Sequence, residues 1–159
     1  ANRNQRRCIK ANRDLDVQIT KRIDRDEHYA LYEEYITLRH QDGDMYPPSR
    51  QQYEEFLSAQ WHLTKFVEFR DNQQLKAVAV IDELDDGLSA IYTFFDAEDS
   101  ARSLGRYAIL WQIGEAHRQG LPYLYLGYWI QGCQKMRYKT EYQPCELLIR
   151  NHWLNAEMD

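Results

Sequence analysis

The chain has 159 residues, of which 43% are hydrophobic and 28% charged, and its net charge is −5 at pH 7. This composition is that of an ordinary globular domain long enough to bury a sizeable core. No apolar run approaches the roughly 20 residues that cross a membrane, and the basic start lacks the apolar region of a secretory signal. Cys8, Cys133 and Cys145 are scattered without metal-ligand spacing, so we expect a cytoplasmic protein that binds no metal.

Basic residues gather at two places on this acidic chain. Residues 1–13 hold five of them and no acid before Asp14, and a second group lies at 135–139; the members are Arg3, Arg6, Arg7, Lys10, Arg13, Lys135, Arg137 and Lys139. Two local patches suit a partner whose phosphates are held at a defined place, whereas the net charge argues against wholesale coating of a nucleic acid. No DNA partner is expected. On charge alone, a solvated basic tail explains the first patch equally well.

The first half of the chain predicts a short opening strand and two helices. Residues Asn2–Asn12 are interpreted as a polar basic arm or as the end of a larger unit, and the first half of Leu15–Ile23 alternates as a strand does. Apolar residues at helical spacing predict a helix over Glu27–Gln41. The segment Asp42–Pro48 breaks it, and a shorter helix follows as far as Leu57.

Three strands are expected next, over Thr64–Arg70, Leu75–Glu83 and Leu88–Phe95. The short polar turns between them are typical of hairpins and predict antiparallel pairing.

The rest of the chain predicts one long helix between strands. A turn at residues 100–107 leads into the helix Leu104–Gln119, which Gly120 and Pro122 end. A strand over Tyr123–Tyr128, a short helix over Gly132–Lys139 and a final strand over Pro144–Ile149 follow. The resulting sheet is mixed, with antiparallel middle strands and the long helix across one face. Trp111 and Ile113 cannot both be buried against one surface, because they are two residues apart on a helix.

Two long segments, SLGRYAILWQIGEA and LPYLYLGYWIQGCQKMRYKTEYQPCELL, resemble the C-terminal domain of aminoacyl-tRNA–protein transferases. The resemblance covers nearly all 159 residues and is strongest to the bacterial branch that adds leucine to proteins beginning with Asp or Glu. It implies a single domain over 1–159 with an α/β fold like that of the N-acetyltransferase (GNAT) superfamily. In the family a cysteine-bearing N-terminal domain precedes this point, and that domain is absent from this sequence.

The resemblance implies attack of a protein α-amino group on the ester of an aminoacyl-tRNA, with leucine favoured and arginine as the other candidate. The partners are then aminoacyl-tRNA and a protein or peptide with an acidic N-terminus, with no cofactor and no membrane, and the product is marked for degradation. Two alternatives stay open, an N-acetyltransferase that uses acetyl-coenzyme A and a non-catalytic module that binds tRNA or protein. The turn before the long helix is a poor version of the glycine-rich coenzyme A loop, which disfavours the first.

Three groups of site residues are expected under this resemblance. Asp96 and Tyr128 are the catalytic candidates. The tRNA-binding candidates, which combine cations, a helix start and a stacking ring, are Arg6, Arg7, Arg102, Ser103, Gly105, Arg106 and Trp129. The acceptor-binding candidates are Lys135, Tyr138 and Lys139, with the two lysines four apart on one helix face. Helix capping, a tyrosine-rich core and solvated lysines are the plain alternatives for these residues.

Overall fold

The computed structural model describes residues 1–57 and 62–156. The element order is α1 (Arg3–Ala11), β1 (Asp16–Thr20), α2 (Asp26–Arg39), α3 (Arg50–Leu57), β2 (Thr64–Asp71), β3 (Gln74–Glu83), β4 (Gly87–Phe95), α4 (Leu104–Arg118), β5 (Tyr123–Tyr125), the 3₁₀ helix η1 (Gln134–Glu141), β6 (Glu146–Ile149) and β7 (His152–Asn155).

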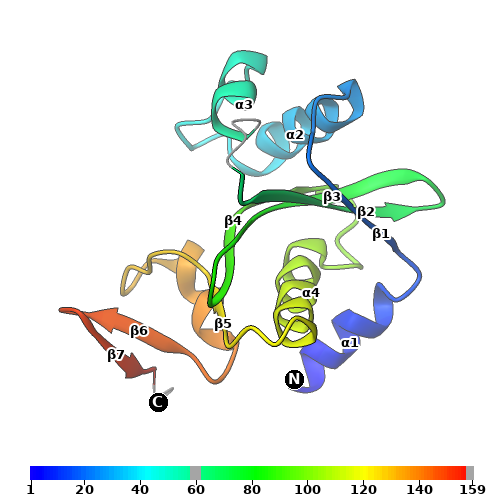
Figure 1. Cartoon of the computed structure of the whole chain (residues 1–159). Coiled ribbons are helices and arrows are strands. Elements are labelled where there is room, and N and C mark those ends of the chain that lie inside the picture. The colour runs from blue at the N-terminus through cyan, green and yellow to red at the C-terminus, as the bar shows by residue number, and fades with distance from the viewer. Residues whose placement is uncertain (58–61, 157–159) are drawn as a thin grey trace.

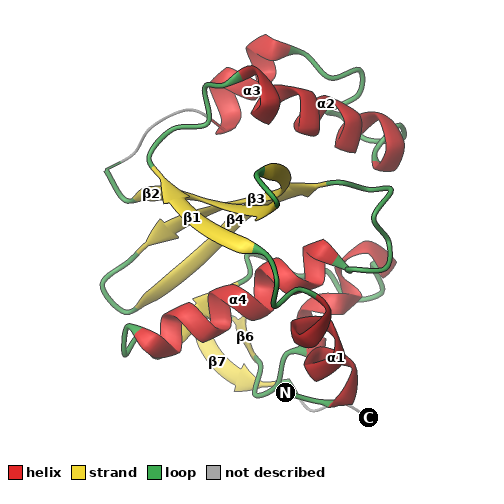
Figure 2. Cartoon of the chain, turned by 90° about the vertical axis from the view of Figure 1, so that its right-hand side faces the viewer, coloured by secondary structure: helices red, strands yellow, loops and turns green. Residues whose placement is uncertain are grey.

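A five-stranded sheet in the order β1-β2-β3-β4-β5 separates two layers of helices, as Figures 1 and 2 show. Helices α2 and α3 cover one face, and α4 and α1 cover the other. Neighbouring residues of β2 serve opposite faces, as strand geometry requires: Phe66 packs in the α2 layer and Val67 in the α4 layer. The antiparallel middle strands and the helix across one face are confirmed.

The pairing of β4 with β5 is parallel and short. It runs from Gly87 opposite Tyr123 to Ser89 opposite Tyr125, although β4 continues to Phe95. Gly87 permits this close approach, because a Cβ there would lie 2.7 Å from the Tyr123 carbonyl oxygen. Beyond Ser89 the two strands no longer pair, so the chain after β5 is free to line a site.

The basic N-terminal stretch, for which no helix was expected, forms the helix α1 and packs against the rest of the molecule. Asn2 caps α1 by accepting from the Gln5 N–H at 2.9 Å, while the Gln5 side chain accepts from the Asn2 N–H. Helix α1 buries Gln5 and Cys8 against the molecule and leaves Arg6 and Arg7 exposed. The sequence has too few apolar residues at helical spacing to indicate a helix here, because the residues that α1 buries are polar or small.

The end of the chain also differs from expectation. The helix expected at 132–139 is the 3₁₀ helix η1, and the expected last strand, β6, is followed by a further strand, β7. The two strands form a separate hairpin, orange to red in Figure 1. Its turn residues Arg150 and Asn151 have positive φ values of 49° and 65°, a conformation that asparagine tolerates better than most residues.

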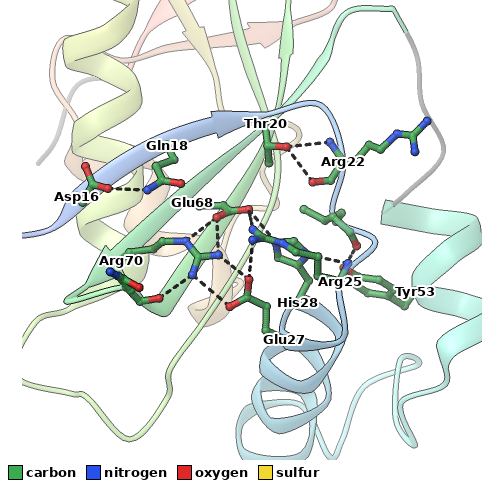
Figure 3. Close-up of polar contacts among 12 residues, drawn as sticks. Asp16, Gln18, Thr20, Arg22, Arg25, Glu27, His28, Tyr53, Glu68 and Arg70 are labelled. Atoms are coloured by element: carbon green, nitrogen blue, oxygen red, sulfur yellow. Dashed lines mark hydrogen bonds and ion pairs between the residues drawn. The ribbon is translucent and has the colours of Figure 1, made fainter.

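A buried network of charges fastens the first turn of α2 to β2 (Figure 3). Glu68 is 1% exposed and accepts hydrogen bonds from His28 at 2.8 Å, Arg25 at 2.6 Å and Arg70 at 2.7 Å. Arg70 also forms an ion pair with Glu27 at 2.8 Å. Burial opposes the charge of Glu68, but the donors outweigh it and hold the pKa of its carboxyl below the ordinary value. Every oxygen of this buried carboxylate is therefore occupied by a structural partner.

Candidate functional site

A cavity of about 1010 Å³ lies between β5, the second half of α4 and the β6–β7 hairpin. Its apolar wall includes one residue of α4, two of the β5 region and three of the hairpin: Ile113, Leu124, Leu126, Leu147, Ile149 and Trp153. The Trp153 ring lies 6.2 Å from the ring of Tyr125, centroid to centroid, so the hairpin is held beside β5 by side-chain contact. Pockets that bind small molecules commonly measure about 300–1,000 Å³, so the cavity is large enough for a ligand.

Lys139 is a cation of this cavity that its own chain holds in place. Its Nζ donates to the carbonyl oxygen of Tyr128 at 2.8 Å and lies 5.5 Å from the centroid of the Tyr128 ring. Partial burial lowers the pKa of Lys139. An ammonium group has three protons to donate, so the backbone contact leaves two for a ligand.

Tyr128 and Trp129 follow β5 and differ in exposure. The Tyr128 side chain is 74% exposed, whereas Trp129 is half-buried and its indole nitrogen is shielded without a hydrogen-bond partner among the described residues. Both residues line the cavity. The catalytic role of Tyr128 and the tRNA contact of Trp129 stay predictions, and Tyr128 has the more accessible ring for stacking.

The turn before α4 is shaped by packing. Ser103 precedes the helix with φ at 52°, in the left-handed region, and makes no side-chain cap bond. A Cβ at Gly105 would lie 2.8 Å from the Phe95 ring, so this glycine makes room for an aromatic side chain. Arg106 forms an ion pair with Glu141 of η1 at 2.9 Å. Packing and ion pairing within the chain therefore explain this turn without a bound phosphate. The tRNA contacts of Ser103, Gly105 and Arg106 stay predictions.

Arg102 is fully engaged by its own chain. Its guanidinium binds both carboxylate oxygens of Asp14 at 2.8 and 2.9 Å and Asp71 at 3.0 Å. It lies 3.4 Å from Asp99 and donates to the Ala11 carbonyl at 3.0 Å. Arg102 therefore ties the end of α1, the β2–β3 turn and the start of α4 together. A contact with tRNA would require some of these bonds to open.

Asp96 also has a structural role at the carboxyl end of β4. Its carboxylate pairs with Lys76 at 2.9 Å and accepts the N–H groups of Glu98 at 3.0 Å and Asp99 at 3.2 Å. Burial opposes the charge, but these partners lower the pKa of Asp96. A general base works best with a pKa near the working pH, so this environment does not favour the predicted catalytic role.

The two acceptor-site lysines point in different directions. On a 3₁₀ helix, with three residues per turn, positions four apart are about 120° away from each other. Lys135 reaches the exposed Asp42 at 2.7 Å, whereas Lys139 turns to Tyr128 and the cavity. Tyr138 lies between them in sequence and is 40% exposed. The structure thus brings Tyr128, Trp129 and Lys139 together and separates Lys135 from them.

Helix α1 begins at the cavity. Ala1 and Gln5 belong to its lining, and the Gln5 amide donates to the Glu141 carbonyl of η1 at 3.2 Å. The exposed cations of the helix continue away from that rim; they are Arg3, Arg6, Arg7 and Lys10. The start of the basic helix therefore borders the cavity.

Sequence reasoning missed much of the cavity wall. His117 and Ile113 of α4 and Trp153 of β7 line the cavity, but none had been singled out for a site. Ile113 carried a signal, because it is 38% exposed while Trp111, two residues earlier, is partly buried against the core on another side of α4, as expected for residues two apart. No signal identified Trp153, because the strand that holds it was not expected.

Two classes of feature are absent from residues 1–57 and 62–156. No group of three or more His, Cys, Asp or Glu side chains there could hold a metal ion. No helix within those ranges is long and apolar enough to cross a membrane.

Comparison with known proteins identifies relatives over nearly the whole chain. The family model "Arginine-tRNA-protein transferase, C terminus" matches residues 27–149. Aspartate/glutamate leucyltransferases of Teredinibacter turnerae and Saccharophagus degradans are 56% identical over 158 residues and 57% identical over 154 residues. The matches cover 99% and 96% of this chain, which spans 65% of the length of each relative.

A solved structure supports the fold. The chain is similar to a ribosomal-protein-alanine N-acetyltransferase from Brucella melitensis, with a TM-score of 0.54 and 13% identity. The similarity covers 78% of this chain and 86% of the other. The expected N-acetyltransferase-like fold is therefore confirmed.

Proposed function

This chain belongs to the family of arginine-tRNA-protein transferases, as their C-terminal part, and from this premise we propose that it transfers leucine from aminoacyl-tRNA to a protein N-terminus. The acceptor begins with Asp or Glu, as the names of the 56% and 57% identical relatives suggest. The reaction takes place in the cytoplasm and marks the acceptor for degradation. The observation that carries the proposal is the family match over residues 27–149, which includes the whole of α4, β5 and η1.

The reaction itself asks little covalent chemistry of the protein. The acceptor's amine nitrogen forms a bond to the aminoacyl carbonyl carbon, the ester bond to the terminal ribose breaks, and the amine proton passes to the ribose oxygen. Because the ester is already activated, the protein contributes mainly by holding amine and ester in contact. A single cavity bordered by Lys139 and Tyr128 is suited to holding two substrates together.

Lys139 is the proposed reader of the acceptor's acidic side chain. Its partly buried ammonium keeps two donors free for a carboxylate, and a low-dielectric surrounding strengthens the contact. Lys135 is less suited, because it and its partner Asp42 are 68% and 70% exposed. The exposed face of α1, with Arg6 and Arg7, is the proposed contact for the tRNA backbone.

The test uses the full chain with labelled leucyl-tRNA or arginyl-tRNA and peptides that begin with Asp, Glu, Asn or Ala. Label should pass from leucyl-tRNA to the Asp and Glu peptides and much less to the Asn and Ala peptides. Acetyl-coenzyme A with the same peptides tests the alternative acetyltransferase activity. Transfer of acetyl groups and not of leucine would refute the proposal, as would tRNA binding without any transfer.

A further inference from the structure

The apolar wall of the cavity has no assigned ligand. Residues from α4, from the segment after β5 and from both strands of the hairpin meet there: Ile113, Leu126, Leu147, Ile149 and Trp153. Ile113 and Ile149 are 38% and 48% exposed. Contact between these apolar side chains and water is unfavourable. An apolar group that covers them would lower the free energy.

The charges around this wall would oppose a cationic ligand. Of the described residues that line the cavity, Glu146 is the only carboxylate, whereas Lys139 is a cation. A guanidinium that entered the cavity would lose its contacts with water. Among the described lining residues, the only carboxylate that could pair with it is Glu146, which is exposed. Burial of a charge without a partner is strongly unfavourable. An uncharged aliphatic side chain pays no such penalty.

The position of the basic helix α1 beside the cavity favours a ligand that is the end of a polyanion. The basic helix α1 starts at the rim formed by Ala1 and Gln5, and its exposed arginines run away from it. A nucleic acid whose phosphates lie along α1 would have its end at the cavity. The volume of about 1010 Å³ leaves room for a terminal nucleoside with an attached amino acid.

We propose that this wall, named here the donor wall and formed by Ile113, Leu126, Leu147, Ile149 and Trp153, binds the amino-acid side chain of the aminoacyl-tRNA and selects an aliphatic residue over arginine. The inference rests on the proposed function and assigns its donor specificity to residues of α4 and the C-terminal hairpin. The β6–β7 hairpin is then a part of the substrate site.

The experiment places a carboxylate in the donor wall. Ile113→Glu keeps a good helix former on α4, and Ile149→Asp makes the equivalent change on β6, so that one variant remains informative if the other fails to fold. The probes are leucyl-tRNA and arginyl-tRNA whose 3′ ester is replaced by an amide, and the readout is their dissociation constants for the full chain. Leucyl-tRNA should bind at least about tenfold more weakly to either variant, the lower range for a lost apolar contact in a pocket. The preference for leucyl over arginyl tRNA should fall with it.

Leu38→Glu is the matched control, because Leu38 is a half-exposed apolar residue of helix α2 outside the cavity. It should leave both dissociation constants unchanged. If the wild-type chain transfers leucine but Ile113→Glu and Ile149→Asp keep its affinity and preference, the donor wall is refuted while the proposed function stands. If the wild-type chain transfers no leucine and binds neither tRNA selectively, the proposed function fails with it.

Discussion

Replacement of Lys139 by alanine should reduce the use of acidic acceptors far more than the same change at Lys135. The two lysines are four residues apart on η1, but only Lys139 lines the cavity and has its ammonium partly buried. Lys135 is paired with Asp42 at the surface. The chain therefore contains its own matched control.

The magnitude follows from the two environments. Loss of a hydrogen bond to a charged group costs about 1.5–3 kcal/mol, and about 1.36 kcal/mol corresponds to tenfold in rate. Lys139→Ala should thus lower kcat/KM for an Asp peptide by roughly 10- to 160-fold. An exposed ion pair contributes about 0–1 kcal/mol, so Lys135→Ala should cost at most about fivefold.

The assay measures kcat/KM for peptides that begin with Asp, Asn and Ala, at a fixed saturating concentration of leucyl-tRNA. Lys139→Ala should raise KM for the Asp peptide and reduce the preference for Asp over Asn. Because burial lowers the pKa of Lys139, the wild-type activity with the Asp peptide should begin to fall at a pH below the ordinary lysine value of about 10.4.

Two results would refute this reasoning. If Lys139→Ala keeps the Asp-over-Asn preference, the ammonium does not read the acceptor's carboxylate. If Lys135→Ala causes an equal or larger loss, the exposed lysine is the reader and the cavity is not the acceptor site.

Three further predictions concern tRNA binding and stability. Charge reversal at Arg6 and Arg7 should weaken tRNA binding and flatten its salt dependence by about 0.7–0.9 in log–log slope per lost phosphate contact; an unchanged affinity and slope in filter binding would limit these arginines to a solvated surface. Glu68→Gln should lower the free energy of unfolding by about 3–5 kcal/mol, because it removes one partner of a buried ion pair, and a loss below about 1 kcal/mol in urea unfolding would contradict the structural role of the network. Hydrogen bonds from Arg102 lower the pKa of Asp14 from 3.8 to about 2. This pair therefore stabilises the fold above pH 3.8 and loses its effect as the pH falls toward 2. Asp14→Asn should reduce the loss of stability over that pH range, and acid unfolding identical to that of the wild type would show that the pair contributes nothing.

The amino-acid sequence by itself determined the middle of the fold. Strands β2, β3 and β4 and helices α2 and α4 lie within a few residues of their predicted bounds, because strand alternation, hairpin turns and helical spacing are local signals. The long segments around α4 and β5 were also sufficient for the family resemblance, which the match over residues 27–149 confirms.

Tertiary structure decided the parts whose signals are weak or distant. Helix α1 docks through Gln5, Cys8 and Asn12, which no hydrophobic pattern marks. The Asn12 amide donates to the Arg102 carbonyl at 2.7 Å across 90 residues of sequence. Two arginines that the sequence could not tell apart therefore differ in the structure. Arg102 pairs with the carboxylates of Asp14 and Asp71, whereas Arg7 is exposed.

The cavity is the clearest case. Lys135 and Lys139 looked equivalent as residues four apart on an α-helix, but the 3₁₀ geometry of η1 turned one toward Asp42 and the other toward Tyr128. The wall opposite Lys139 comes from α4 and from a hairpin whose second strand was not expected. A hollow exists only where separate elements meet without filling the space between them, and the local pattern of a single segment carries no information about that meeting.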